Sequence, residues 1–367
     1  MNSIANDVIY LASCAANGTI PDKARVESMD LPAVYNLASR HMITAVVAFA
    51  LESAGYKDKQ SSNAIAAAMR KNAIFDQEWS AIRAQLEQAG IWHMPLKGAA
   101  LKDLYPKYGM REFADHDILF DATRADDVKS IMVNMGYKAE HFGTGNHDCY
   151  YKLPCLNFEM HRALFGPGHE EKLYEYYKGI ENKLIKGTGY ERSFTPEDCY
   201  LYFLSHEYKH YSGGGTGLRS LLDTFVYLSK TKLNMDYVAA EAEELGIRDF
   251  EVKNRSLSLH LFSGVELTEA DWEMLEYILS SGTYGTITHQ VENKMRKKGW
   301  SKIQYALNRF SVPVSKKNKD YNNFAGQYPF FYKYRILLPI LPFYRTFRAM
   351  KGGRFGAEAK AIRDAQG

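Results

Sequence analysis

The sequence predicts an α+β fold in which a small mixed β-sheet is flanked by helical N- and C-terminal regions. Apolar residues recur at helical spacing up to about residue 90, and short apolar or alternating runs follow between residues 91 and 161. Helical spacing returns from about residue 169 onward. The change of period marks the sheet, because helices and strands place their buried residues at different intervals.

Residues 1–90 are the predicted helical N-terminal region. Ile4, Val8 and Leu11 follow a helical repeat, and further apolar positions continue it. Gly90 marks the expected end of the last helix of this region, since glycine commonly follows a helix.

Residues 91–190 are the predicted core. Strands are expected at four runs bounded by turn residues, namely 91–96, 116–120, 149–153 and 156–161. Helices are expected between the first strands, at 99–104 and 123–135. The resulting order is β-α-β-α-β-β.

Residues 191–320 are a predicted helical domain, and residues 321–367 are a basic, aromatic C-terminal segment. Helical spacing in the domain is clearest over 196–210, 218–229, 237–245 and 271–279. The net charge of +3 conceals an asymmetry, because residues 290–367 hold 17 Lys or Arg against 4 Asp or Glu. Such a basic end favours anionic partners.

The composition is that of a folded globular protein, with 46% hydrophobic and 24% charged residues. The first residues carry no basic leader followed by an apolar run, so we expect a cytoplasmic protein. Four cysteines are scattered without a C-x-x-C pair, which predicts reduced thiols rather than disulfides or a thiolate zinc site.

Three acidic residues form the strongest candidate site. Asp115 and Asp117 are two apart on a predicted strand, so their side chains should point to the same face. On a later strand, the same alternation places Asn157, Glu159 and His161 on one face. If the two strands pair, Asp115, Asp117 and Glu159 can hold two Mg²⁺ ions about 4 Å apart for phosphoryl chemistry.

Phosphate-binding groups precede these carboxylates. Gly98 opens a predicted helix directly after a strand, which lets backbone amides approach an anion. Lys97 and Arg111 add positive charge nearby. The phosphates of a substrate would be held by these residues, beside metal ions bound to the carboxylates.

Four runs of the core are distinctive, namely L-K-G-A-A-L, Y-P-K-Y-G-M-R, D-H-D-I-L and F-E-M-H-R. Two more lie in the helical part, T-P-E-D-C-Y-L-Y-F-L-S-H and L-R-S-L-L-D. Through them the chain resembles the bacterial uncharacterised nucleotidyltransferase family, a branch of the polymerase-beta-type nucleotidyltransferase superfamily, over most of residues 90–350.

The resemblance implies a nucleotidyltransferase-type mixed sheet and transfer of a nucleotidyl group from an NTP to an acceptor hydroxyl, on a small molecule or sugar. It implies that Asp115 and Asp117 are metal ligands and that Glu159 is the third carboxylate and the base. The superfamily usually has Ser or Gly after the glycine of the turn, whereas Ala99 follows Gly98 here. The alternative is therefore a catalytically weak nucleotide-binding or regulatory module.

A second motif suggests a different chemistry. His206, Glu207 and His210 form H-E-x-x-H, which on a helix can bind zinc as in metallopeptidases. Lys209 lies between the two histidines and opposes a cation, and no third ligand is evident. The competing interpretation is that His206 faces the cleft and contacts the nucleotide or Asp223, and His161 beside Glu159 is a similar candidate.

The stretch from Tyr328 to Met350 is rich in Phe and Tyr and contains basic residues and three prolines. These interruptions exclude a transmembrane helix, which needs about 20 apolar residues in succession. The segment either lies on an anionic membrane surface, at the inner face of the membrane, or packs against the preceding helices. No nucleic-acid-binding module is recognisable, so nucleic acid is not an expected partner.

Overall fold

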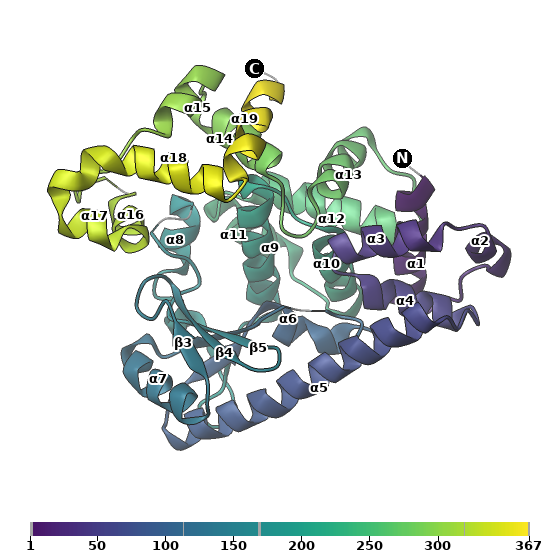
Figure 1. The fold of residues 1–367 in the computed structure, drawn as a ribbon. Helices are drawn as coiled ribbons and strands as arrows, with labels where there is room; N and C mark the ends of the chain where they lie inside the picture. Colours follow the sequence, from purple (N-terminus) through teal and green to yellow (C-terminus); the bar gives the residue numbers. More distant parts are fainter. Residues whose placement is uncertain (1–2, 113, 168–169, 319, 366–367) are drawn as a thin grey trace.

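The computed structural model describes residues 3–112, 114–167, 170–318 and 320–365, and its helices and strands form three neighbouring groups (Figure 1). A five-stranded sheet with two flanking helices lies on one side. A large helical body lies beside the sheet, and the C-terminal helices extend from it. The predicted α+β architecture with helical flanks is confirmed.

Five helices make up the N-terminal region: α1 (Ser3–Asn17), α2 (Lys23–Glu27), α3 (Leu31–Arg40), α4 (Thr44–Ser53) and α5 (Lys59–Gln88). Asp22, Asp30 and Asp58 cap α2, α3 and α5 by accepting hydrogen bonds from first-turn amides. Helix α5 has 30 residues and runs along the base of the molecule from α4 to the sheet (Figure 1).

The sheet contains β1 (His93–Pro95), β2 (His116–Phe120), β3 (Lys138–Glu140), β4 (His147–Lys152) and β5 (Leu156–His161), in the order β1-β2-β5-β4-β3. Strands β2 and β5 pair in parallel and the other neighbours are antiparallel, so the sheet is mixed. The four predicted strands are confirmed. Strand β3 was not predicted, because Lys-Ala-Glu offers no apolar alternation.

One face of the sheet is covered by α5 and by α7 (Ala125–Asn134), and the side chains between them form a compact apolar cluster. Phe158 and Met160 of β5 are fully buried in this cluster, against Phe75 of α5 and Met132 of α7. The residues that alternate with them on β5 therefore point to the opposite face, which α5 and α7 leave uncovered.

The helical body contains α8 (Glu171–Tyr177), α9 (Pro196–Gly213), α10 (Leu218–Lys230), α11 (Met235–Glu244), α12 (Arg248–Ser263) and α13 (Glu269–Ser281). Its apolar side chains share one cluster with those of α1, α3 and α4. Helix α1 packs directly on α12, where Asn17 Nδ2 donates to the Phe262 carbonyl at 2.8 Å. Helices α1, α3 and α4, which the predicted boundary at residue 90 assigns to a separate region, therefore share an apolar core with the helical body.

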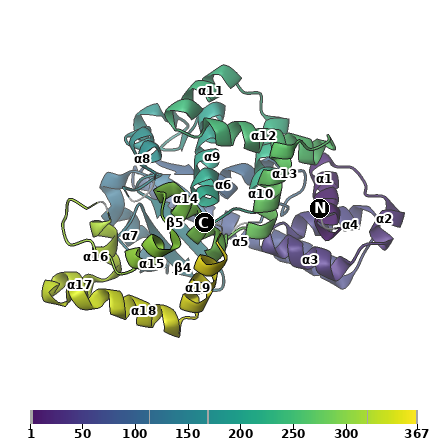
Figure 2. The same cartoon turned by 90° about the horizontal axis from the view of Figure 1, so that it is seen from above.

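The C-terminal helices are α14 (Ile287–Lys298), α15 (Lys302–Asn308), α16 (Tyr321–Gln327), α17 (Pro329–Lys333), α18 (Leu341–Lys351) and α19 (Arg354–Asp364). Seen from above, α17 and α18 lie at the opposite end of the molecule from the N-terminal helices (Figure 2). A small separate cluster joins α14 to α19. Within the described ranges, every helix is too short or too polar to span a bilayer.

Candidate active site

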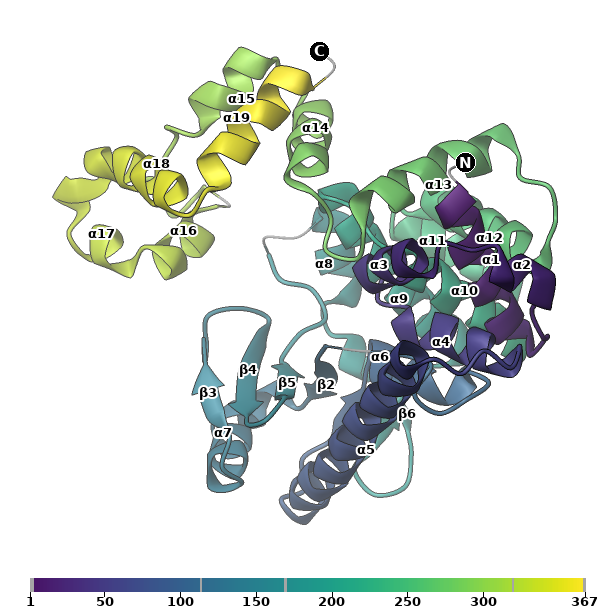
Figure 3. The same cartoon turned by 45° about the vertical axis from the view of Figure 1, so that its right-hand side comes forward.

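Asp117 and Glu159 are direct neighbours across the parallel pair of β2 and β5, where their Cα atoms are in register. Both side chains project from the face that is opposite to the apolar cluster, as the alternation of residues on each strand requires. Figure 3 shows β2 beside β5. The structure therefore brings together the two carboxylates that the sequence placed on separate strands.

Asp115 precedes β2 and is half-buried, close to the other two carboxylates. Burial raises the pKa of Asp115, and the negative charges of Asp117 and Glu159 raise it further. Three carboxylates thus converge at the start of β2, with Lys97 as a nearby cation. Such a cluster carries excess negative charge that a divalent ion can offset.

Asp117 is the most strongly held of these groups. Lys97 Nζ and His161 Nε2 both lie 2.8 Å from Asp117 Oδ1. Burial opposes ionisation of Asp117, but Lys97 and His161 outweigh burial and lower its pKa. Lys97 reaches Asp117 from a left-handed backbone conformation, with φ at 49°, which is uncommon for a residue with a side chain. The strand-to-helix junction is therefore shaped to present the Lys97 ammonium.

The donor atoms fit a divalent metal ion. One ligand atom each from Asp117, Glu159 and His161 lie within 4.8 Å of one another. Carboxylate oxygens are the ligands that Mg²⁺ prefers, and water and substrate phosphates complete its shell. Asp115 is not part of this closest group of described residues, although its charge interacts with those of Asp117 and Glu159.

Gly98 and Arg111, the other predicted phosphate-binding residues, are both buried. Gly98 lies in the first turn of α6 (Lys97–Leu101), directly after β1 and beside β2. Arg111 forms a two-pronged ion pair with Asp223 of α10, with Nε to Oδ1 at 2.7 Å and Nη2 to Oδ2 at 2.8 Å. Phosphate binding by Arg111 remains a prediction, and its observed partner is a carboxylate.

Helix α9 faces the carboxylates from the helical body. The charges of Lys97 and His161 act on His206, so its imidazole lies near the carboxylate site. Burial, and then the charges of Lys97, Lys209, His210 and His161, keep the pKa of His206 well below its usual range. Asp223 accepts hydrogen bonds from Arg111 and Tyr105, and the suggested contact between His206 and Asp223 is not formed among the described residues.

The H-E-x-x-H residues do not assemble a peptidase site. His206 and His210 face each other, with their Nε2 atoms 3.3 Å apart. Glu207, by contrast, is buried and accepts a hydrogen bond from Asn254 Nδ2 at 2.8 Å. Neither potential metal cluster in the described part of the chain includes these three residues.

Lys209 is a site residue that the sequence argument missed. Its ammonium interacts with Lys97, Asp117 and Glu159, so it faces the carboxylates from α9. Burial and the charge of Lys97 lower the pKa of Lys209 to about 8. The sequence did hold a signal, since Lys209 is three residues after His206 and therefore close to the same helix face.

A family model described as "Uncharacterised nucleotidyltransferase" matches residues 27–263. The chain belongs to this nucleotidyltransferase family. The matched range contains the sheet, the three carboxylates and helices α9 and α10, and it ends before the C-terminal helices. No curated protein and no solved structure matches the chain. Membership of this family makes the protein a nucleotidyltransferase, and the part of the chain that matches the family includes the carboxylate site.

The buried pair of Arg111 and Asp223 leads to a stability prediction for this nucleotidyltransferase. Asp223→Ala should lower the free energy of unfolding by about 3–5 kcal/mol, because it leaves the Arg111 guanidinium buried without a counter-charge. The double variant Arg111→Met/Asp223→Leu should lose clearly less, since neither charge remains. Urea unfolding followed by circular dichroism measures both changes.

Asp127→Ala provides the matched control, because Asp127 pairs with Arg124 on an exposed helix face. This variant should lose less than about 1 kcal/mol. Equal losses for Asp223→Ala and Asp127→Ala would contradict the role assigned to the buried pair.

Proposed function

We propose that the protein uses Mg²⁺ and an NTP such as ATP to transfer a nucleotidyl group to a hydroxyl of a small molecule or sugar. The observation that carries this proposal is the in-register pairing of Asp117 with Glu159, with Asp115 beside them. When bound, two divalent ions at such carboxylates stabilise the charge that develops during in-line displacement at phosphorus. The remaining roles belong to the chain's own side chains.

The phosphates of the NTP are the proposed partners of Lys97, Lys209 and His206. Lys97 and Lys209 approach the carboxylates from opposite elements, α6 and α9, and both carry charge that suits a triphosphate. Gly98, Arg111 and His161 complete the proposed nucleotide-binding set, Gly98 by its position at the start of α6. Positive groups placed around the transferring phosphate also stabilise its transition state.

Glu159 is the proposed base for the acceptor hydroxyl. Its carboxylate lies next to Asp117 and its side chain is partly exposed, so an acceptor can reach it. Burial raises the pKa of Glu159, but the interaction with His161, whose Nε2 lies 3.7 Å from Glu159 Oε2, contributes to a net lowering. Glu159 is therefore ionised at neutral pH and can accept a proton.

A catalytically weak nucleotide-binding or regulatory module is the second candidate. Ala99 favours it, because this position in the turn offers no hydroxyl to a phosphate and the Ala99 amide already donates to the Leu96 carbonyl at 3.1 Å. Binding of Mg²⁺ and NTP without transfer to any acceptor in a cell extract would establish this candidate.

Metal-dependent nucleotide binding is the central prediction. NTP alone should leave the melting temperature unchanged, because its phosphates and the three carboxylates repel each other. Mg²⁺ with NTP should raise it, by the equivalent of about 2.7 kcal/mol at a ligand concentration 100 times Kd. Asp117→Asn should abolish the shift, and thermal unfolding with and without each ligand measures it.

The Asp127→Ala protein serves again as a surface control and should keep the full shift. A shift by NTP alone that survives in Asp117→Asn would show that nucleotide binds elsewhere.

The lowered pKa of Lys209 predicts a pH dependence for NTP binding. Lys209 is charged below its pKa of about 8 and loses its attraction for phosphate as the pH rises through that value. Binding of Mg²⁺ and NTP should therefore weaken above pH 8, roughly tenfold or more, as expected for loss of one charge-assisted hydrogen bond. Isothermal titration calorimetry across this pH range gives the affinities.

Lys209→Met should bind weakly at every pH, whereas Lys209→Arg should bind without the loss above pH 8, because a guanidinium stays charged. Burial also raises the pKa of Glu207 to about 8, and both variants retain Glu207. A loss above pH 8 that persists in Lys209→Arg would assign the effect to another group.

The C-terminal helices are the proposed contact with an anionic membrane surface at the inner face of the membrane. Phe343 and Phe347 of α18 are each 67% exposed and lie one helical turn apart, with Met350 continuing the row. Arg348 and Lys351 are exposed on the same helix. An exposed apolar row next to basic residues is typical of helices that lie in a lipid interface.

Removing the apolar row should therefore remove binding to lipid. The protein is expected to sediment with vesicles that contain phosphatidylserine, and Phe343→Ser/Phe347→Ser should stay in the supernatant. Ile303→Ser is the control, because Ile303 is 71% exposed but lies on α15. Equal sedimentation of both variants would leave α18 without a role at the membrane.

A further inference from the structure

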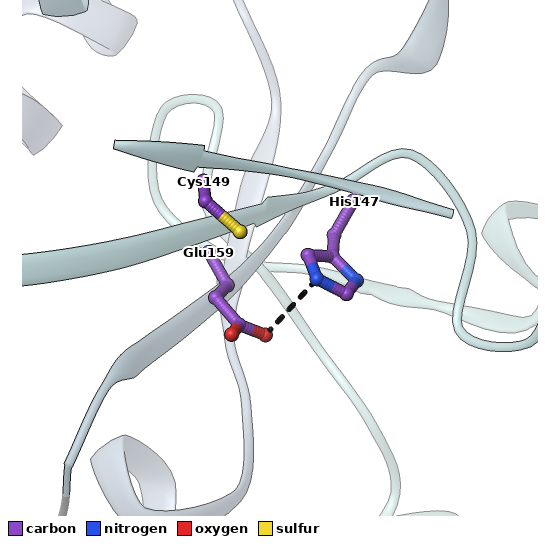
Figure 4. Close-up of side chains that lie close together, drawn as sticks. All are labelled: His147, Cys149 and Glu159. Carbon is purple, nitrogen blue, oxygen red and sulfur yellow. Dashed lines mark ion pairs between the residues drawn. The ribbon is translucent and has the colours of Figure 1, made fainter. Parts of the chain in front are cut away.

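A second group of potential metal ligands lies on the polar face of the sheet, next to the carboxylate site (Figure 4). It consists of His147 and Cys149 on β4 and Glu159 on β5. Cys149 and Glu159 are directly paired across the two antiparallel strands, and His147 is two residues before Cys149 on the same face. All three side chains are therefore positioned by strands and not by loops.

The spacing of the three donor atoms suits one small cation. One atom from each side chain lies within 4.8 Å of the other two. His147 Nε2 is 3.5 Å from Glu159 Oε2, and Figure 4 shows the Cys149 sulfur beside the same carboxylate. A tetrahedral zinc shell with bonds of about 2.0–2.3 Å separates its ligand atoms by about 3.5 Å. Only small side-chain movements are needed to close the site.

The surroundings of His147 and Cys149 support a ligand role. His147 is half-buried and directs its Nε2 atom toward the Glu159 carboxylate. Cys149 is buried, at 8% exposure, whereas Cys155 in the turn after β4 is exposed. A half-buried imidazole and a buried thiol therefore share one carboxylate on the same face of the sheet.

We propose that His147, Cys149 and Glu159 bind a borderline-soft divalent ion of the Zn²⁺ class, with the fourth position open to water or substrate. The chemistry of the ligands selects this class, because thiolate and imidazole prefer Zn²⁺ or Co²⁺ whereas Mg²⁺ requires oxygen ligands. The Cys149 thiol releases its proton to solvent when its sulfur binds the ion, so one proton leaves for each ion bound.

Glu159 belongs to both potential metal groups, so this ion can regulate binding of Mg²⁺ and NTP. This regulatory effect rests on the function proposed above. Glu159 Oε2 lies 3.5 Å from His147 Nε2 and 3.7 Å from His161 Nε2, between the two potential metal groups. An ion held by His147 and Cys149 draws Glu159 away from the site of Asp117. Zn²⁺ therefore antagonises the binding of Mg²⁺ and NTP in the intact enzyme.

Cobalt substitution tests the site without relying on nucleotide or activity. Titration of the full-length protein with Co²⁺ should produce a thiolate-to-cobalt charge-transfer band in the near ultraviolet, reaching one equivalent. Cys149→Ser should abolish the band and Cys155→Ser should keep it. His147→Ala should weaken Co²⁺ binding by about 100-fold or more, because loss of even an outer-shell partner costs about 10–100-fold.

Asp117→Asn separates this proposal from the proposed function. It should keep the cobalt band, since Asp117 is not a ligand of this ion, while losing the response to Mg²⁺ and NTP. In the wild-type protein, Zn²⁺ should suppress the thermal shift caused by Mg²⁺ and NTP, and Cys149→Ser should restore that shift. A wild-type protein that binds Co²⁺ without a thiolate band, or a band that survives in Cys149→Ser, would overturn the assignment.

Discussion

The parallel pairing of β2 with β5 is the constraint on which the rest of the site depends. It holds Asp117 and Glu159 side by side on a partly buried face of the sheet. Two like charges at 4 Å repel by about 4 kcal/mol at the effective dielectric near a protein surface. The fold offsets this repulsion with Lys97 and His161, which both bond to Asp117. Negative charge that these two side chains leave uncompensated can attract metal cations.

The helical body supplies the opposing wall of the site. Helix α9 directs Lys209 and His206 toward the carboxylates, and α10 holds the loop before β2 through the pair of Asp223 and Arg111. Helices α1, α3 and α4 share one apolar cluster with α10 and α12. The N-terminal helices therefore fix the helical body, and through it they position the residues that face the sheet.

The polar face of the sheet presents two different sets of ligands in a continuous row. The carboxylate oxygens of Asp117 and Glu159 suit Mg²⁺, and the nitrogen and sulfur of His147 and Cys149 suit softer ions. Glu159 lies between them and can serve only one ion at its full strength. In the proposed assignments, the identity of the available metal therefore determines whether the enzyme holds its nucleotide.

The sequence by itself determined the features that depend on local period. Strand alternation placed Asn157, Glu159 and His161 on one face, and helical spacing located α9 and α10 to within a few residues of their observed bounds. These predictions succeeded because each side chain's direction follows from its own element.

Only the tertiary structure decided which elements meet. The placement of β2 beside β5, the pair of Arg111 and Asp223, the approach of Lys209 to Asp117 and the contact of His147 with Glu159 all join separate elements. The sequence predicted Arg111 to be a cation available for phosphate, because its partner Asp223 is 112 positions away in the chain. The sequence predicted that Cys149 is an isolated thiol, because Cys149, His147 and Glu159 form a cluster only when β4 and β5 pair. Contacts across the chain leave no periodic signal in the local sequence, so the packed fold alone decides them.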